Sequence, residues 1–166
     1  VVIDDHELTT PGGVVPVRTY RPAASGGPWP SILWLHGGGM VVGTHLDDAQ
    51  CSRIVAEVGV AVASVGYRLA PEYQYPAALD DIAATVDWVR GDTAATLGFD
   101  PTRLVIAGQS AGGGLAASIA QRLHDEGVAL DGQLLIYPML DDRTVTRADI
   151  GRKEHLIWNN LSNEVG

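Results

Sequence analysis

Residues 103–113 of the chain read RLVIAGQSAGG, an apolar run that passes directly into a serine flanked by glycines. The run at 103–107 is typical of a buried strand, and the alanine-rich stretch 110–125 predicts a helix that starts at once. A strand followed so closely by a helix is the unit from which α/β domains are built. This stretch therefore sets the fold class and puts a serine at the turn.

The same alternation of strands and helices extends to both sides of this unit. Apolar or alternating runs predict strands, and apolar residues at helical spacing predict helices. The expected strands are 14–20, 31–35, 60–65 and 132–137, and the expected helices are 47–58 and 77–90. Pro16 indicates that 14–20 is an edge strand, because proline cannot donate a ladder hydrogen bond. The fold class is thus α/β, with a doubly wound, mostly parallel sheet covered by helices on both faces.

The turn itself, Gly108-Gln109-Ser110-Ala111-Gly112, has the pattern G-x-S-x-G. Between a strand and a helix this pattern presents a nucleophilic hydroxyl on a strained turn, and the flanking glycines relieve the crowding. The helix that begins here adds a positive dipole and free backbone N–H groups where an oxyanion would form. Two other interpretations stay open: the glycines only permit close packing of strand against helix, or Gly112-Gly113-Gly114 cradles a phosphate.

A second glycine cluster, His36-Gly37-Gly38-Gly39, follows the expected strand 31–35. Glycines here let the backbone turn its N–H groups toward a ligand, as the second half of an oxyanion hole requires. His36 is interpreted as a side chain that braces this loop rather than as the catalytic base. Standing alone, the cluster would be interpreted as a flexible surface turn, and its pairing with the serine motif favours the catalytic interpretation.

The composition excludes several classes of function. Eleven Lys and Arg against twenty Asp and Glu among 166 residues give a net charge of −9, which repels nucleic acid and anionic membranes. A single cysteine allows neither an internal disulfide nor a cysteine cluster around a metal. Apolar runs fall short of the roughly 20 residues of a membrane span, and the acidic start is unlike a signal peptide. The expectation is a cytoplasmic protein without a metal or cofactor.

Four segments of the chain, taken together, carry a more specific signal. They are His36-Gly37-Gly38-Gly39, Tyr67-Arg68-Leu69-Ala70-Pro71-Glu72, Gly108-Gln109-Ser110-Ala111-Gly112-Gly113 and Tyr137-Pro138-Met139-Leu140-Asp141. In this order they resemble the hormone-sensitive-lipase-like carboxylesterases of the α/β-hydrolase superfamily. The resemblance implies an α/β-hydrolase fold, no cofactor, and a small-molecule ester of short or medium acyl length as substrate.

The resemblance also implies roles for single residues. Ser110 would be the nucleophile, and the backbone N–H groups of Gly38, Gly39 and Ala111 would form the oxyanion hole. His36, Gly37, Gly108 and Gly112 belong to the supporting motifs. Arg68 and Glu72 resemble a structural ion pair that fixes their loop, for which a solvated surface pair is the alternative.

The chain departs from this family at two positions beside the motifs, where Gln109 and Gly66 stand in place of residues that are usually acidic. Neither change removes a catalytic group. The triad acid and histidine of the family follow two further strands, so residues 1–140 are interpreted as a partial catalytic domain and 141–166 as the truncated start of a cap-type excursion. A triad within the chain would have to combine Ser110 with Asp141, Asp142 or Asp149 and with His155.

The expected function is hydrolysis of carboxylic esters through an acyl-enzyme on Ser110, with this chain alone weakly active or inactive because it lacks the family's base. The alternative from another class is a degenerate α/β-hydrolase scaffold that binds a small apolar ligand. An amidase or peptidase would use the same residues. A sheet without its last strands exposes an edge, which predicts self-association into a homo-oligomer.

Overall fold

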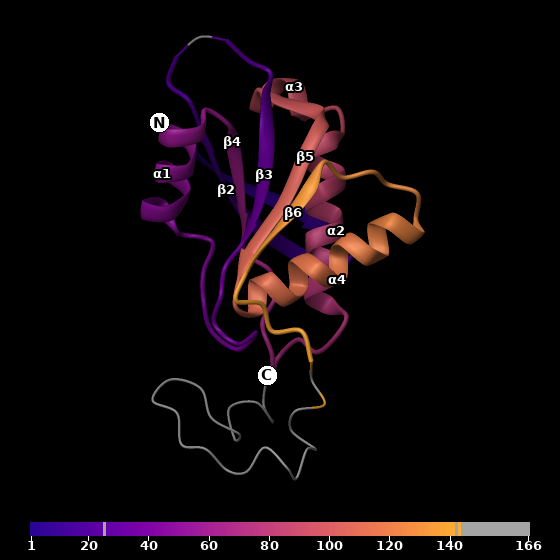
Figure 1. Ribbon diagram of the computed structural model, residues 1–166. Coiled ribbons are helices and arrows are strands. Elements are labelled where there is room, and N and C mark those ends of the chain that lie inside the picture. The colour runs from indigo at the N-terminus through magenta and orange to yellow at the C-terminus, as the bar shows by residue number, and fades with distance from the viewer. Residues whose placement is uncertain (25, 142, 144–166) are drawn as a thin grey trace.

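The computed structural model of the chain describes residues 1–24, 26–141 and 143. Its strands are β1 Val2–Thr10, β2 Gly13–Arg21, β3 Trp29–Leu35, β4 Ala61–Val65, β5 Phe99–Gln109 and β6 Gly132–Ile136, and its helices are α1 Asp48–Val58, α2 Ala77–Arg90, α3 Ala94–Leu97 and α4 Ala111–Asp125. Within these described residues the strands form one sheet in the order β1-β2-β4-β3-β5-β6 (Figure 1). The predicted strands and helices therefore all form, with boundaries shifted by a few residues at most.

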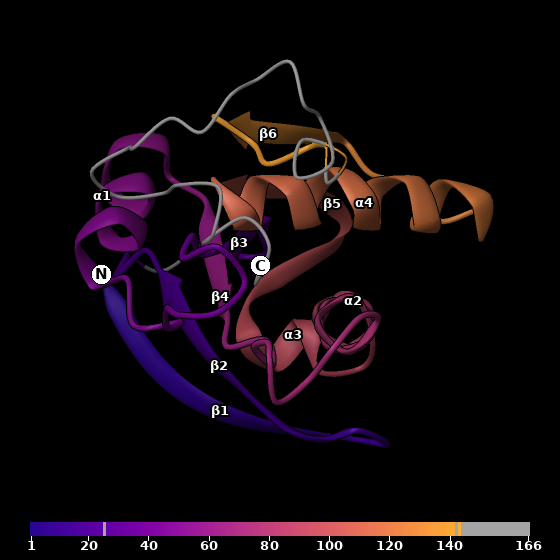
Figure 2. The same cartoon turned by 90° about the horizontal axis from the view of Figure 1, so that it is seen from below.

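The sheet is mixed but mostly parallel. Strands β4, β3, β5 and β6 run parallel to one another, whereas β1 pairs antiparallel with β2 and β2 pairs antiparallel with β4. Helices cover both faces, with α1 on one side and α2, α3 and α4 on the other (Figures 1 and 2). This arrangement confirms the expected α/β class with a doubly wound sheet.

The prediction that 14–20 is an edge strand is wrong, because β2 lies between β1 and β4. Pro16 is tolerated there by its position at the end of one ladder. The pairing of β2 with β4 stops at Val17 and Val65, and the Pro16 carbonyl accepts a hydrogen bond from the Gly66 N–H at 2.8 Å. In a strand, the nitrogen and the carbonyl of one residue point to the same side. The nitrogen of Pro16 therefore also faces the β4 side, beyond the last residue pair of the β2–β4 ladder.

Two apolar cores flank the sheet, because successive side chains of a strand point to opposite faces. Leu33 and Leu35 of β3 pack under α2 and α4, while Trp34 packs under α1. Cys51 of α1 is fully buried beside Trp34, and burial raises the pKa of its thiol to about 12. The helices are therefore fixed to the sheet from both sides.

The edges of the described sheet are β1 and β6. Strand β6 is partly exposed, and the side chain of Leu134 is 50% accessible. Self-association through this edge stays a prediction. The proposed excursion at 141–166 lies almost wholly outside the described residues. No helix in the described part of the chain is long and apolar enough to cross a bilayer.

Candidate active site

The sheet brings the two glycine motifs together. Strands β3 and β5 are parallel neighbours, and Leu35 pairs with Gly108 at their carboxyl ends. The glycine loop (residues 37–40) follows β3, and the serine turn (residues 108–112) follows β5. A Cβ atom placed on Gly37 would lie 3.4 Å from the Cβ of Ser110. Segments about seventy residues apart thus touch at the point where α/β folds place their ligands.

The backbone of Ser110 is strained, with φ 53° and ψ −118°, outside the ordinary regions for a side-chain-bearing residue. Hydrogen bonds hold it there. Its N–H donates to the Ile136 carbonyl at 2.9 Å, and its carbonyl accepts from the N–H groups of Gly114 at 3.1 Å and Met139 at 3.0 Å. The end of β6 and the first turn of α4 therefore fix the position of the serine.

The glycines of the serine turn are required by close contacts. A side chain on Gly112 would overlap the carbonyl groups of Leu35 and His36, and one on Gly108 would overlap the backbone of Gly112. The start of α4 therefore rests directly on the end of β3. Only glycine permits this approach, which brings the helix N-terminus to the glycine loop.

The glycine loop leaves two of its N–H groups unused. The Gly38 carbonyl accepts from the N–H groups of Val41 at 3.1 Å and Val42 at 3.0 Å, which closes a turn. Gly38 and Gly39 have φ of 121° and 62°, values that glycine adopts without strain. Among the described residues, neither Gly38 nor Gly39 gives its N–H to a backbone or side-chain acceptor.

The first residue of α4, Ala111, also has a backbone N–H that is not used. Ala111 is fully buried, and its N–H has no acceptor within the described part of the chain because it opens the helix. Gly39 is buried as well. Buried N–H groups without partners are rare in folded proteins, since each costs about 1–3 kcal/mol. Donors of this kind beside a serine can stabilise the negative oxygen of a tetrahedral intermediate.

The His36 side chain braces the glycine loop. Its Nδ1–H donates to the Gly37 carbonyl at 2.7 Å, and its ring stacks on Tyr67 with centroids 4.2 Å apart. The Tyr67 hydroxyl donates to the His36 carbonyl at 2.7 Å. Burial lowers the pKa of His36, so the imidazole is held neutral. Both side chains thus fix the strand-to-loop junction.

Comparison with known proteins identifies the family. A model of the alpha/beta hydrolase fold matches residues 32–163, which include both glycine motifs. The chain belongs to the α/β hydrolase fold family. The resemblance to hormone-sensitive-lipase-like carboxylesterases is confirmed by the relatives that it matches.

Three relatives of this α/β hydrolase chain illustrate the match. Ethyl acetate hydrolase of Pseudomonas putida is 42% identical over 149 residues, which cover 84% of this chain and 45% of that protein. Carboxylesterase NlhH of Mycobacterium tuberculosis is 44% identical over 128 residues, which cover 75% and 39%. A bacterial heroin esterase structure superposes with a TM-score of 0.86 at 38% identity, covering 97% and 52%. The chain thus spans about half the length, or less, of these relatives.

The two departures from this α/β hydrolase family are accommodated locally. Gln109 accepts a hydrogen bond from the Tyr137 hydroxyl at 3.2 Å through its side-chain oxygen. Gly66 has no room for a side chain, because a Cβ atom there would lie 2.7 Å from Pro16 and 2.8 Å from Nδ1 of His45. The half-buried His45 ring therefore fills the space beside Gly66, and burial lowers its pKa.

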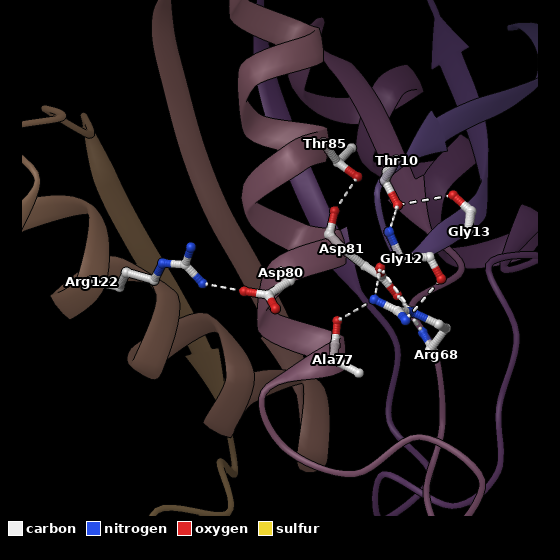
Figure 3. Close-up of polar contacts among 9 residues, drawn as sticks. All are labelled: Thr10, Gly12, Gly13, Arg68, Ala77, Asp80, Asp81, Thr85 and Arg122. Carbon is white, nitrogen blue, oxygen red and sulfur yellow. Dashed lines mark hydrogen bonds and ion pairs between the residues drawn. The ribbon is translucent and has the colours of Figure 1, made fainter.

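The predicted ion pair between Arg68 and Glu72 is wrong. Arg68 instead pairs with Asp81 of α2, a carboxylate that is 1% exposed, through Nε and Nη2 at 2.8–3.0 Å (Figure 3). The backbone N–H of Arg68 also donates to Asp81 at 2.9 Å, and its guanidinium reaches the Gly12 carbonyl at 3.0 Å. Glu72 is exposed. The buried partner is preferred because an unpaired charge inside α2 would be costly.

Two functional positions were missed by reasoning from the sequence. Asp81 falls on the same helical face as Ile82, Thr85 and Val89, so its spacing already marks a buried charge that needs a cation. Tyr67 belongs to a recognised segment, but its bond to His36 joins two loops, and a local pattern carries no signal for such a bond.

The candidate acid and base residues are only partly described. The Asp141 carboxylate accepts hydrogen bonds from the Arg143 guanidinium at 2.8 and 3.0 Å. Asp142, Asp149 and His155 lie outside the described residues, so the hypothesis of an internal triad stays a prediction. Within residues 1–24, 26–141 and 143, no group of His, Cys, Asp and Glu has an arrangement suited to a metal ion.

Proposed function

We propose that this protein hydrolyses carboxylic esters through an acyl-enzyme on Ser110. The observation that carries the proposal is the contact between the glycine loop and the serine turn, with the unused N–H groups of Gly38, Gly39 and Ala111 around it. The names of the relatives, an ethyl acetate hydrolase and a carboxylesterase among them, support the same chemistry.

In the first step, the Ser110 hydroxyl oxygen attacks the ester carbonyl carbon and gives its proton to a base. The carbonyl oxygen becomes negative and accepts hydrogen bonds from the N–H groups of Gly38, Gly39 and Ala111. Each such donor is worth on the order of 100- to 1,000-fold in rate. The intermediate then collapses, the bond to the alcohol oxygen breaks, and the alcohol leaves with the proton held by the base.

The second step returns the enzyme to its starting state. Water gives a proton to the base and attacks the acyl-enzyme, the same N–H groups bind the new oxyanion, and the carboxylic acid leaves as the Ser110 oxygen regains a proton. His36 is unsuited as this base, because its ring is held by Gly37 and Tyr67, and because burial disfavours the imidazolium that it would become on accepting a proton. The base of the proposed reaction is therefore a group other than His36.

The proposal is tested by hydrolysis of p-nitrophenyl butyrate by the purified protein, side by side with Ser110→Ala. We expect the activity of Ser110→Ala to fall to the background rate, a loss of about 10⁶-fold in a complete triad enzyme. Ser52→Ala on α1 is the matched control and should keep the activity of the parent. Covalent labelling by a fluorophosphonate, read by intact mass, detects Ser110 reactivity even when turnover is slow.

The outcomes separate the proposed function from its alternative. Labelling that disappears in Ser110→Ala supports the esterase proposal. A protein that neither turns over the ester nor reacts with the fluorophosphonate contradicts it, and then the degenerate scaffold that binds a small apolar ligand becomes the better account. Comparison of p-nitrophenyl butyrate with butyryl p-nitroanilide tells whether esters are preferred over amides.

A further inference from the structure

Gln109 lies directly beside the nucleophile of the candidate site. It is the last residue of β5, it precedes Ser110, and it pairs with Ile136 at the end of β6 (Figure 1). A Cβ atom placed on Gly37 would lie 3.4 Å from Cγ of Gln109 and 3.4 Å from Cβ of Ser110. The two side chains therefore lie close together beside the glycine loop, and both are partly exposed.

A hydrogen bond fixes the orientation of the Gln109 amide. The Tyr137 hydroxyl donates to the side-chain oxygen of Gln109 at 3.2 Å. Tyr137 belongs to the segment after β6 that is fastened to the serine turn, because the Met139 N–H donates to the Ser110 carbonyl at 3.0 Å. Since its oxygen is bound to Tyr137, the amide directs its nitrogen elsewhere. Within the described part of the chain, the bond to Tyr137 is the one hydrogen bond of this side chain.

The Gln109 NH₂ group is thus an unused donor next to Ser110. Once a substrate displaces water from this donor, the donor needs an acceptor on the substrate. A site with such a donor discriminates against a substrate that lacks the matching acceptor. The acidic residue that usually stands at this position in the family offers acceptors only when it is ionised. The glutamine therefore changes what this side of the site recognises.

We infer that Gln109 determines substrate specificity by donating a hydrogen bond to a second oxygen atom of the ester. The preferred substrates are esters that carry an ether or carbonyl oxygen near the bond that is cleaved. The net charge of −9 disfavours anionic substrates, so this oxygen belongs to an uncharged group. The inference rests on the proposed function, because it places the ester carbonyl carbon at Ser110.

The test compares two racemic probes of equal length, O-ethyl p-nitrophenyl butylphosphonate and O-ethyl p-nitrophenyl (2-methoxyethyl)phosphonate. The second probe has an ether oxygen in place of one methylene group. Ser110 attacks phosphorus, an O–P bond forms, the bond to p-nitrophenolate breaks, and the serine proton passes to the base or to solvent. The two enantiomers place the alkyl group on opposite sides of the site, so one pair of probes samples both sides.

The measured quantity is the ratio of the labelling rate constants, methoxyethyl to butyl, read from p-nitrophenolate release and confirmed by intact mass. Comparing this ratio between variants cancels the different intrinsic reactivity of the two probes. Gln109→Glu keeps an acceptor for the Tyr137 hydroxyl but loses the NH₂ donor. We expect the ratio at pH 8 to fall about fivefold or more in Gln109→Glu.

Two further variants control this comparison. Gln109→Leu removes the donor without adding a charge, so it should lower the ratio to a similar extent, and it replaces Gln109→Glu if that variant folds poorly. Gln121→Glu makes the same chemical change as Gln109→Glu at an exposed position near the end of α4. Its ratio should equal that of the parent.

Each result decides one point. A lower ratio in Gln109→Glu or Gln109→Leu, with the Gln121→Glu ratio unchanged, supports the inference. Labelling that depends on Ser110 but has the same ratio in all variants overturns the inference and leaves the proposed function standing. Loss of labelling with both probes in folded Gln109 variants also overturns it, because Gln109 would then fix the serine turn instead of selecting substrates. Absence of Ser110-dependent labelling in the parent overturns the proposed function and the inference with it.

Discussion

The serine turn and the glycine loop are held in place in different ways. At the serine turn, Ser110 is fixed by backbone hydrogen bonds to Ile136, Gly114 and Met139. The glycine loop is also held by side chains, because the His36 imidazole donates to the Gly37 carbonyl and the Tyr67 hydroxyl donates to the carbonyl of His36, just before the loop. The serine turn should therefore be sensitive to atoms added at its glycines, whereas the glycine loop should be sensitive to atoms removed from its braces.

The largest effect is expected at the ion pair of Arg68 and Asp81, which lies next to Tyr67 in the chain. Arg68 follows Tyr67 and is tied to Asp81 by its backbone and its guanidinium, so Asp81→Asn leaves a partly buried cation without its counter-charge. We expect the free energy of unfolding, measured in urea, to fall by about 3 kcal/mol. Glu72→Gln, at an exposed position, should change it by less than about 0.5 kcal/mol. Equal losses in the two variants would contradict the Arg68–Asp81 assignment.

An added methyl group at the serine turn comes next. In Gly112→Ala the new side chain would overlap the Leu35 and His36 carbonyls, so α4 must move away from β3. The expected loss of unfolding free energy is about 2–3 kcal/mol, with slower phosphonylation of Ser110. Gly127→Ala is the comparison without a close contact: its φ of 76° disfavours a side chain, but no atom lies within 4 Å, and it should cost only about 1 kcal/mol. A Gly112→Ala variant no less stable than Gly127→Ala would rule out the close approach.

Removal of one brace should affect the glycine loop more than stability. Tyr67→Phe deletes the donor to the His36 carbonyl, at a cost of about 1 kcal/mol, and it should slow phosphonylation of Ser110 by about tenfold because the N–H groups of the loop lose their alignment. Tyr20→Phe deletes a comparable hydroxyl bond, to Asp48 at 2.7 Å, on the other face of the sheet. It should lower stability by a similar amount and leave the labelling rate unchanged. A slower labelling rate in Tyr20→Phe would contradict the specific role of Tyr67 in holding the glycine loop.

The smallest expected effect is a dependence of stability on pH that arises from His36 and His45. Burial lowers the folded-state pKa of His36 and of His45 below the unfolded value of 6.5. The unfolded chain therefore binds these protons first as pH falls, so the stability is complete above pH 6.5 and declines below it. We expect the free energy of unfolding to fall by at most about 1.4 kcal/mol per pH unit for each histidine, measured by urea unfolding at pH 7.5 and 5.5. In His36→Asn the decline should be smaller, and an unchanged slope would exclude His36 as its source.

Local sequence patterns predicted the elements of this fold well, for a physical reason. The strand β4 is buried on both faces and its sequence is apolar throughout, and α2 matches its predicted range because its apolar spacing is regular. The strand order was less accessible. Pro16 indicated an edge strand, but proline excludes only one hydrogen bond on one side, and the end of the β4 ladder lies just there.

The same contrast between local patterns and long-range pairing holds for the candidate site. Ser110 and the glycines were found from the sequence because the backbone conformation or the close contacts at these positions permit few other residues. The partner of Arg68 was assigned to a nearby residue, Glu72, whereas the structure uses Asp81 from a helix thirteen positions away. Long-range pairing depends on how helices pack, and short motifs do not encode it.

The buried cysteine offers a way to observe local opening of the structure directly. Cys51 is the single cysteine of the chain, and with a pKa of about 12 its thiol stays protonated near neutral pH. It can react with a thiol reagent only after α1 separates from Trp34 and the sheet. The rate of that reaction in native buffer therefore measures how often the α1 side of the molecule opens, independently of any event at Ser110.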